Sequence, residues 1–251
     1  MDINYQETSK DLLTRIDIHE KYGDASIDEW TNRLLDPQPG MRILDVGCGA
    51  GKLCFLFNSY THGGASIIGG DFSEELLERA RQMNRDLGAN VSFQFLDFNK
   101  PFSFPDGTFD LLTSAFAIYY AADLSFTFGE AHRVLKPGGR LFVSGPLPEN
   151  KQMFYDIIRE ATDAAIPPMP GSSRFKGEIF DTIDRLFART ELHRFENNLT
   201  FPAVEPFIEY VRASLSEDRR LWTSMFNGKQ EYEALIGKIQ AVAQRRFERD
   251  G

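Results

Sequence analysis

The sequence predicts an α/β protein: a mostly parallel sheet with helices on both faces, followed by a helical cap after the fifth strand. Between Met41 and Gly145, short apolar runs alternate with segments of helical periodicity, which is the pattern of strands joined by covering helices. The runs are almost uninterrupted, as expected for strands that are buried on both faces. A chain of 251 residues is long enough for one large domain with a smaller cap.

Three helices are expected between five strands. The clearest helix runs from Ser73 to about Leu87, because Ser73 can cap its N-terminus and two glutamates follow. Another begins after Gly51, and a third runs from about Leu124 to about Leu135, where the sequence KPGG is expected to end it. The predicted strands are Met41–Val46, Ser66–Gly70, Val91–Leu96, Phe109–Ala115 and Arg140–Ser144.

The pattern changes after Gly145, where five prolines interrupt a segment rich in helix formers and phenylalanine. This segment is the predicted cap. A further strand is expected over Glu191–Phe201, and an amphipathic helix around Tyr232–Val242. The expected division of the chain is a helical lid at 1–39, a core at 40–145, the cap at 146–190, and a C-terminal strand and helices at 191–251.

Composition excludes several classes of partner. The net charge is -9 and the basic residues are scattered, so no nucleic-acid partner is expected. No apolar segment reaches the ~20 residues of a membrane span, and no basic start precedes an apolar run, so we expect a cytoplasmic protein. The two cysteines, Cys48 and Cys54, are interpreted as reduced thiols. The four histidines are far apart and predict no metal site.

The most informative stretch is ILDVGCGAGKL, Ile43–Leu53. Three glycines, Gly47, Gly49 and Gly51, follow a buried strand and open a helix, so the backbone there can approach a ligand at the carboxyl end of the strand. A phosphate-binding loop does not fit this register, because it would need glycine where Val46 stands and a hydroxyl residue at the last position of the stretch.

A dinucleotide site does not fit well either. The glycine motif of a dinucleotide site needs its third glycine at the position of Lys52, but the third glycine here is Gly51, one residue earlier. Asp45, two residues before the first glycine, would repel a pyrophosphate and attract a cationic group. The ligand is therefore expected to carry a positive charge at this end.

Two more aspartates follow the next two strands. Asp71 stands about 20 residues after the glycines, where a carboxylate can accept both hydroxyls of a ribose. Asp97 can accept from an exocyclic amine, and Phe72 or Phe98 can offer an aromatic face to a purine. A nucleoside with a cationic amino-acid tail and no phosphate is S-adenosylmethionine.

With these residues the chain resembles the class I S-adenosylmethionine-dependent methyltransferases, particularly those acting on small molecules, whose fold is Rossmann-like. The resemblance covers roughly Gly40 to Gly145 and rests on five motifs in the family's order. They are ILDVGCGAGKL, IIGGDFSEELLERA, FQFLDF, FDLLTSAFAIYYAADL and EAHRVLKPGGRLFV. The resemblance also implies an antiparallel pair of final strands, of which only one is visible in the sequence.

The resemblance implies a role for each cofactor-binding residue. At the methionine end it implies contacts from Asp45, from the backbone of Gly47, Cys48 and Gly49, from the backbone of Ala115, and from Arg15 and Tyr22 over the carboxylate, with Gly51 permitting close helix packing. At the nucleoside end it implies Asp71 on the ribose, Phe72 beside the adenine, Asp97 on its amino group and the Phe98 amide on a ring nitrogen.

Methyl transfer from a sulfonium is a direct displacement that needs no metal, and alignment with desolvation alone contributes ~7–11 kcal/mol in favourable cases. Whether a catalytic base is used is therefore left open, and S-adenosylhomocysteine is the expected product. Tyr119, Asn150 and Arg174 are predicted to contact a small-molecule acceptor, whose methylated atom, O, N or C, is left open. Two alternatives remain open, an aminopropyltransferase-like enzyme and a non-catalytic S-adenosylmethionine-binding protein.

Overall fold

The computed structural model describes residue 3, residues 8–167 and residues 174–250. The chain forms two compact units. The first, here called the helical unit, is assembled from Met1–Ser26, Glu149–Met169 and Glu196–Gly251. The second, the sheet unit, comprises Ile27–Pro148 and Pro170–Phe195. This division differs from the predicted one, because the expected lid and the expected cap are each shared between the two units.

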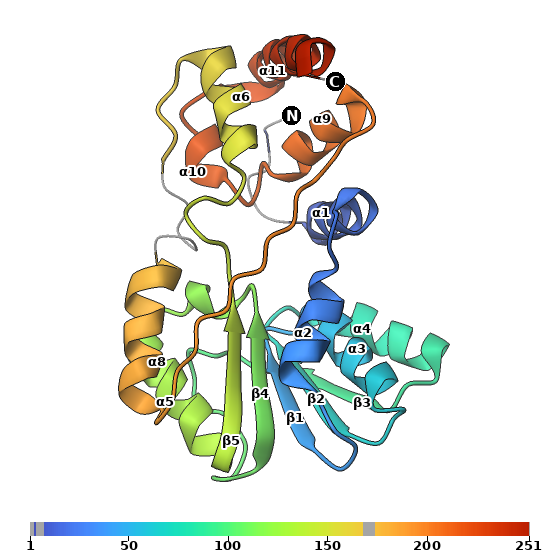
Figure 1. The fold of residues 1–251 in the computed structure, drawn as a ribbon, viewed down its shortest axis with the longest axis vertical. Coiled ribbons are helices and arrows are strands. Elements are labelled where there is room, and N and C mark those ends of the chain that lie inside the picture. Colours follow the sequence, from blue (N-terminus) through green and yellow to red (C-terminus); the bar gives the residue numbers. More distant parts are fainter. Residues whose placement is uncertain (1–2, 4–7, 168–173, 251) are drawn as a thin grey trace. The chain divides into compact units, whose positions relative to one another are not determined.

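The sheet unit contains five parallel strands in the order β3-β2-β1-β4-β5 (Figure 1). From β1 the chain first adds β2 and β3 on one side of the sheet and then β4 and β5 on the other. Ligands of such sheets bind at the point where this order switches, beside β1. The α/β class and the parallel sheet are confirmed. The strands are β1 (Arg42–Val46), β2 (Ser66–Asp71), β3 (Val91–Phe95), β4 (Phe109–Ala115) and β5 (Leu135–Ser144).

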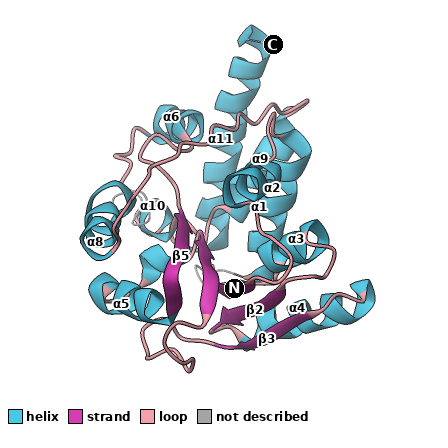
Figure 2. Cartoon of the chain, turned by 60° about the horizontal axis from the view of Figure 1, so that its bottom comes forward, coloured by secondary structure: helices cyan, strands magenta, loops and turns pink. Residues whose placement is uncertain are grey.

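Helices cover both faces of this sheet (Figure 2). Successive strand residues point to opposite faces, and Ile43 and Leu44 of β1 are both fully buried. Ile43 packs in one apolar cluster with Phe57, and Leu44 in another with Val134. The helices of the sheet unit are α2 (Ile27–Leu35), α3 (Lys52–Tyr60), α4 (Glu74–Leu87), α5 (Leu124–Val134) and α8 (Phe180–Leu186), with short turns η1 (Ile118–Tyr120) and η2 (Phe175–Ile179).

The predicted N-terminal cap of α4 is present, and a glycine caps its C-terminal end. The Ser73 hydroxyl accepts from the backbone N–H of Leu76 at 3.4 Å, and Gly88 ends the helix in the left-handed conformation with φ 60°. α5 ends at Val134, close to the predicted end, but β5 begins earlier than the predicted Arg140. The tetrapeptide KPGG lies inside β5, which begins at Leu135, and a register irregularity between Phe109 and Leu111 of β4 accommodates it.

The helical unit has its own apolar core. Phe154, Ile158, Val211 and Trp222 are all buried there, and Trp222 is fully enclosed. The predicted C-terminal helix is confirmed as part of a longer one. The helices of this unit are α1 (Ser9–Tyr22), α6 (Gln152–Thr162), α9 (Val204–Ala213), α10 (Arg219–Trp222) and α11 (Gly228–Asp250).

The strand predicted over Glu191–Phe201 is wrong. In this fully described segment the only ladder contact is a single antiparallel bridge between Leu199 and Gly23, supported by the N–H of Thr200, which donates to the carbonyl of Tyr22 at 2.9 Å. Its partner is the end of α1, which offers too short an extended stretch for a ladder. Across the parts of the chain that the structure describes, no helix is both long and apolar enough to traverse a bilayer.

Candidate functional site

The strand register brings the predicted nucleoside-binding residues to one edge of the sheet unit. Asp45 of β1 pairs with Gly69 of β2 on one side and with Thr113 of β4 on the other. The glycine turn follows β1, Asp71 ends β2, and Ala115 ends β4. Since the strands are parallel, these groups share the carboxyl edge.

The three glycines of the turn have different reasons to be glycine. All have positive φ, at 76°, 55° and 85° for Gly47, Gly49 and Gly51. A Cβ at Gly47 would lie 2.4 Å from the Cβ of Ala117, and one at Gly51 would lie 2.7 Å from Cζ of Phe93. Nothing lies within 4 Å of a Cβ built at Gly49. Gly47 and Gly51 therefore permit internal packing, whereas Gly49 leaves its backbone approachable.

The amide groups of the turn already have partners within the protein. The N–H groups of Gly47 and Cys48 donate to the carbonyl of Gly70 at 2.7 and 3.0 Å. The N–H of Gly49 donates to Oδ2 of Asp71 at 2.8 Å. What Gly47, Cys48 and Gly49 can still offer a ligand from their backbone is carbonyl oxygen, which accepts from an ammonium group. Contact between this backbone and the amino-acid tail of a ligand stays a prediction. It now involves only the backbone carbonyls of these residues.

Asp45 is buried beneath the turn. Its Oδ1 accepts from the Thr113 hydroxyl at 2.7 Å, and its Oδ2 lies 3.6 Å from the thiol Sγ of Cys54, which donates to it. Burial, aided by the negative charge of Asp71, raises the pKa of the Asp45 carboxyl to about 6. The predicted attraction for a cation thus comes from a carboxyl that ionises close to neutral pH.

Asp71 joins two backbone segments at the same edge. Besides the Gly49 contact, its Oδ1 accepts from the N–H of Ser73 at 2.8 Å. Each carboxylate oxygen has a second lone pair, so both can still accept from a hydroxyl. The next residue, Phe72, is 71% exposed, so its ring is available to an aromatic ligand.

Asp97 lies in the loop after β3, where it organises a turn. Its Oδ1 accepts from the backbone N–H of Asn99 at 2.9 Å and from the side-chain amide of Asn99 at 3.0 Å. The Oδ1 of Asn99 in turn accepts from the N–H of Ala122 at 2.8 Å. The half-buried Phe98 accepts at its carbonyl from the Thr127 hydroxyl at 3.0 Å. These bonds fix the loop against the start of α5.

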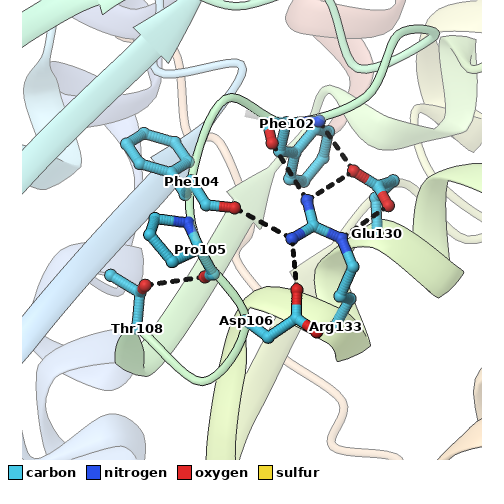
Figure 3. A network of polar contacts seen from close by, with 7 residues as sticks. All are labelled: Phe102, Phe104, Pro105, Asp106, Thr108, Glu130 and Arg133. Carbon is cyan, nitrogen blue, oxygen red and sulfur yellow. Dashed lines mark hydrogen bonds and ion pairs between the residues drawn. The ribbon is translucent and has the colours of Figure 1, made fainter.

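The continuation of this loop is held by one arginine (Figure 3). The Arg133 guanidinium donates to the carbonyls of Phe102 and Phe104 at 2.9 and 2.8 Å and to Oδ1 of Asp106 at 2.7 Å. It also binds both carboxylate oxygens of Glu130, at 2.8 and 2.7 Å. Arg133 therefore serves structure, and it anchors the chain that follows the predicted adenine-binding residues.

The predicted acceptor-binding residues are distributed over both units. Tyr119 is buried in a cluster with Phe128 and Ile179. The Arg174 guanidinium donates to the carbonyls of Tyr119 and Ala121, both at 2.7 Å, and also to Glu178. It therefore supports the loop after β4. Asn150 belongs to the helical unit. Contact of these residues with an acceptor stays a prediction.

Arg15 and Tyr22 also belong to the helical unit, whereas the glycine turn belongs to the sheet unit. Arg15 is buried, and its guanidinium donates to the carbonyl of Ala213 at 2.6 Å and lies 3.4 Å from Oε2 of Glu217. The Tyr22 ring packs on Phe201, with ring centroids 5.3 Å apart. Their predicted contact with a methionine carboxylate stays a prediction.

Sequence reasoning missed Thr113 and Cys54 as partners of Asp45. A signal was present for Thr113, because it is a polar residue inside the apolar strand FDLLTSA and is fully buried. Buried polar groups require hydrogen-bond partners, so a threonine in this position indicates a polar neighbour on the adjacent strand.

A parallel sheet in this order, with a glycine turn after its central strand, defines a Rossmann-like domain of the methyltransferase type. Residues 37–191 match the family described as Methyltransferase domain, and the chain therefore belongs to that family. In a solved structure, a methyltransferase from Aquifex aeolicus that depends on S-adenosylmethionine, the same fold is seen at 23% identity and a TM-score of 0.51, over 64% of this chain and 78% of that chain.

Curated relatives share the same region. The chain is 34% identical to demethylmenaquinone methyltransferase of Thermus thermophilus over 145 residues, which are 57% of this chain and 65% of the relative. It is 35% identical to nocamycin O-methyltransferase of Saccharothrix syringae over 117 residues, which are 46% of this chain and 41% of the relative. The chain thus matches less than two thirds of the length of either relative.

Proposed function

We propose that the chain transfers a methyl group from S-adenosylmethionine to a small-molecule acceptor by direct displacement. The observation that carries the proposal is the carboxyl edge of the sheet unit, where the approachable Gly49 follows the strand of Asp45 and donates its N–H to the carboxyl of Asp71. Family membership and two relatives named for small molecules support it.

The residues at this edge of the sheet fit S-adenosylmethionine. Asp45 is a buried carboxyl whose hydrogen-bond partners, Thr113 and Cys54, are uncharged, so a cationic ligand would complement it. Carbonyl oxygens of the turn would hold an ammonium, Asp71 would hold the ribose, and the exposed Phe72 would flank the base. When bound, S-adenosylmethionine supplies an electrophilic methyl group on a sulfonium. The protein's own residues bind, orient and exclude water, and no dedicated base is assigned.

Turnover of methyl-labelled S-adenosylmethionine tests the proposal. The purified chain is incubated with the labelled compound and small quinols, phenols and amines, and products are followed by mass spectrometry together with S-adenosylhomocysteine. We expect label in an acceptor and an equal amount of S-adenosylhomocysteine. Binding without transfer to any acceptor would support the non-catalytic alternative. A parallel incubation uses decarboxylated S-adenosylmethionine, and transfer of its aminopropyl group without any methyl transfer would support an aminopropyltransferase.

A further inference from the structure

Phe116 lies at the end of β4, close to the glycine turn and within the same sheet unit. It follows the last residue of β4, and its N–H donates to the carbonyl of Ser144, the last residue of β5, at 3.0 Å. The next residue, Ala117, is the one against which Gly47 packs. Phe116 is therefore fixed at the carboxyl edge between β4 and β5, one residue from the contact with the turn.

The backbone of Phe116 is strained. Its φ is +53°, in the left-handed region that bulky side chains rarely adopt. The other non-glycine residues with positive φ in the described parts of the chain are Asp36, His62, Lys151 and Asp163, all polar. Strain of this kind persists where the surroundings impose it, and it is concentrated at functional sites.

Core packing does not account for this conformation. The Phe116 side chain is 47% exposed, whereas Ile118 and Tyr119, two and three residues later, are 0% and 8% exposed. The left-handed residue thus places an aromatic ring at the surface while the chain after it turns into the core. The ring of Tyr119, by contrast, is packed in an apolar cluster.

We infer that the Phe116 ring is the wall of the cofactor site at its sulfonium end and binds the sulfonium through its aromatic face. The inference rests on the proposed function. The ring is at the end of β4, which is the neighbour of β1 and of Asp45, whereas Phe72 and Phe98 follow β2 and β3. An aromatic face attracts a cation, and a phenyl ring also excludes water from the reacting methyl group.

Comparison of two ligands tests the inference without knowledge of the acceptor. S-Adenosylmethionine carries the sulfonium charge, and S-adenosylhomocysteine has a neutral thioether in its place. Calorimetric titration is done with wild type, F116L and F116Y. We expect F116L, which keeps apolar bulk, to weaken S-adenosylmethionine binding about two- to thirtyfold, with less than about a twofold change for S-adenosylhomocysteine. F116Y keeps the aromatic face and should behave as wild type.

Two further variants separate binding from folding. F116G and F116A both lack the ring, but glycine adopts a positive φ without strain, so F116G should unfold at a higher temperature than F116A and still show the F116L binding pattern. F126L, which changes a 38% exposed phenylalanine on α5, should leave both affinities unchanged. If F116L lost affinity equally for both ligands, or for neither, this inference would be overturned but the proposed function would not. Failure of wild type to bind either ligand would overturn the proposed function as well.

Discussion

Asp71 and Gly49 are joined by a 2.8 Å hydrogen bond from the glycine N–H to Oδ2 of the carboxylate. This bond connects the end of β2 to the middle of the glycine turn. The same carboxylate holds Ser73, the cap of α4, through its other oxygen. One side chain therefore shapes the turn and presents the lone pairs proposed to accept from a ribose.

Removal of this carboxylate should weaken cofactor binding. We expect D71A to raise the free energy of S-adenosylhomocysteine binding by about 1–3 kcal/mol, because ribose hydroxyls and the Gly49 N–H lose their acceptor. Calorimetric titration measures the effect. D86A is the matched control, since Asp86 lies on the exposed face of α4 and contacts Gln82. An affinity in D71A equal to that of D86A would contradict the ribose assignment.

The two glycine substitutions G47A and G63A separate backbone strain from steric contact. Gly47 and Gly63 have nearly equal φ values of 76° and 72°, so alanine costs both about 1–2 kcal/mol of backbone strain. Only at Gly47 does the new Cβ meet Ala117, at 2.4 Å, whereas at Gly63 the nearest atom is 4.0 Å away. We expect G47A to lose about 1–3 kcal/mol more unfolding free energy than G63A.

Urea unfolding of both variants measures this difference. G47A should also lose S-adenosylhomocysteine binding, because Ala117 or the turn must move, while G63A should bind as wild type does. Equal stabilities of G47A and G63A would show that the turn relaxes freely around Gly47 and that this glycine is not required for packing.

The sequence predicted the five strands, the three helices α3, α4 and α5 of the sheet unit, and the glycine turn because their signals are local. Apolar runs, a serine cap and a strand-to-helix junction each lie within a few residues. The bond between Asp45 and Thr113 depends instead on the pairing of β1 with β4, a contact between residues 68 positions apart. Arg174 illustrates the same limit, since its role as a donor to carbonyls 53 and 55 residues away leaves no local pattern.

The expected strand over Glu191–Phe201 failed for a related reason. Its alternation is imperfect, and a strand exists only when a partner strand is available. The structure offers the end of α1 instead, so a single bridge at Leu199 forms. The division of the chain into units was equally hidden, because the helical unit is assembled from three separate segments whose apolar faces meet only in the fold.

Asp45 should make stability depend on pH. Its folded pKa of about 6 lies above its ordinary value of 3.8, so folding favours the protonated carboxyl. The contribution of this carboxyl to the free energy of unfolding is at its maximum below about pH 4 and falls as the pH rises toward about 6. Above that pH it is constant, about 3 kcal/mol below its maximum. D45N should remove this loss. It should therefore be more stable than wild type at pH 7.5, while binding S-adenosylmethionine more weakly.

Thermal unfolding at pH 5 and pH 7.5 checks this expectation. D110N is a control of opposite sign, because the Arg42 N–H and the Lys136 ammonium lower the pKa of the Asp110 carboxyl. Its ionised form is therefore favoured by folding, and D110N should destabilise the protein at pH 7.5. If D45N lowered stability at pH 7.5 as D110N does, the assigned effect of burial on Asp45 would be wrong.

A buried charge cluster connects three segments of the helical unit. Lys151, just before α6, binds Glu217 and lies 3.4 Å from Oδ2 of Asp218, while Arg15 of α1 lies 3.4 Å from Glu217. The Tyr155 hydroxyl donates to Asp218 at 2.9 Å. Burial opposes ionisation of Glu217, but the charges of Lys151 and Arg15 outweigh it and lower the pKa of the Glu217 carboxyl.

Removal of the Lys151 charge should therefore destabilise the helical unit strongly. K151M replaces the ammonium with an apolar chain of similar length and leaves two buried carboxylates with less compensation, which costs about 3–5 kcal/mol. Without Lys151, burial would raise the pKa of the Glu217 carboxyl, so the loss should be smaller at pH 5 than at pH 7.5. At pH 7.5 the double variant K151M/E217Q should recover part of the unfolding free energy that K151M loses. Urea unfolding of the three proteins at both pH values measures these effects, and a K151M protein within about 1 kcal/mol of wild type at pH 7.5 would contradict them.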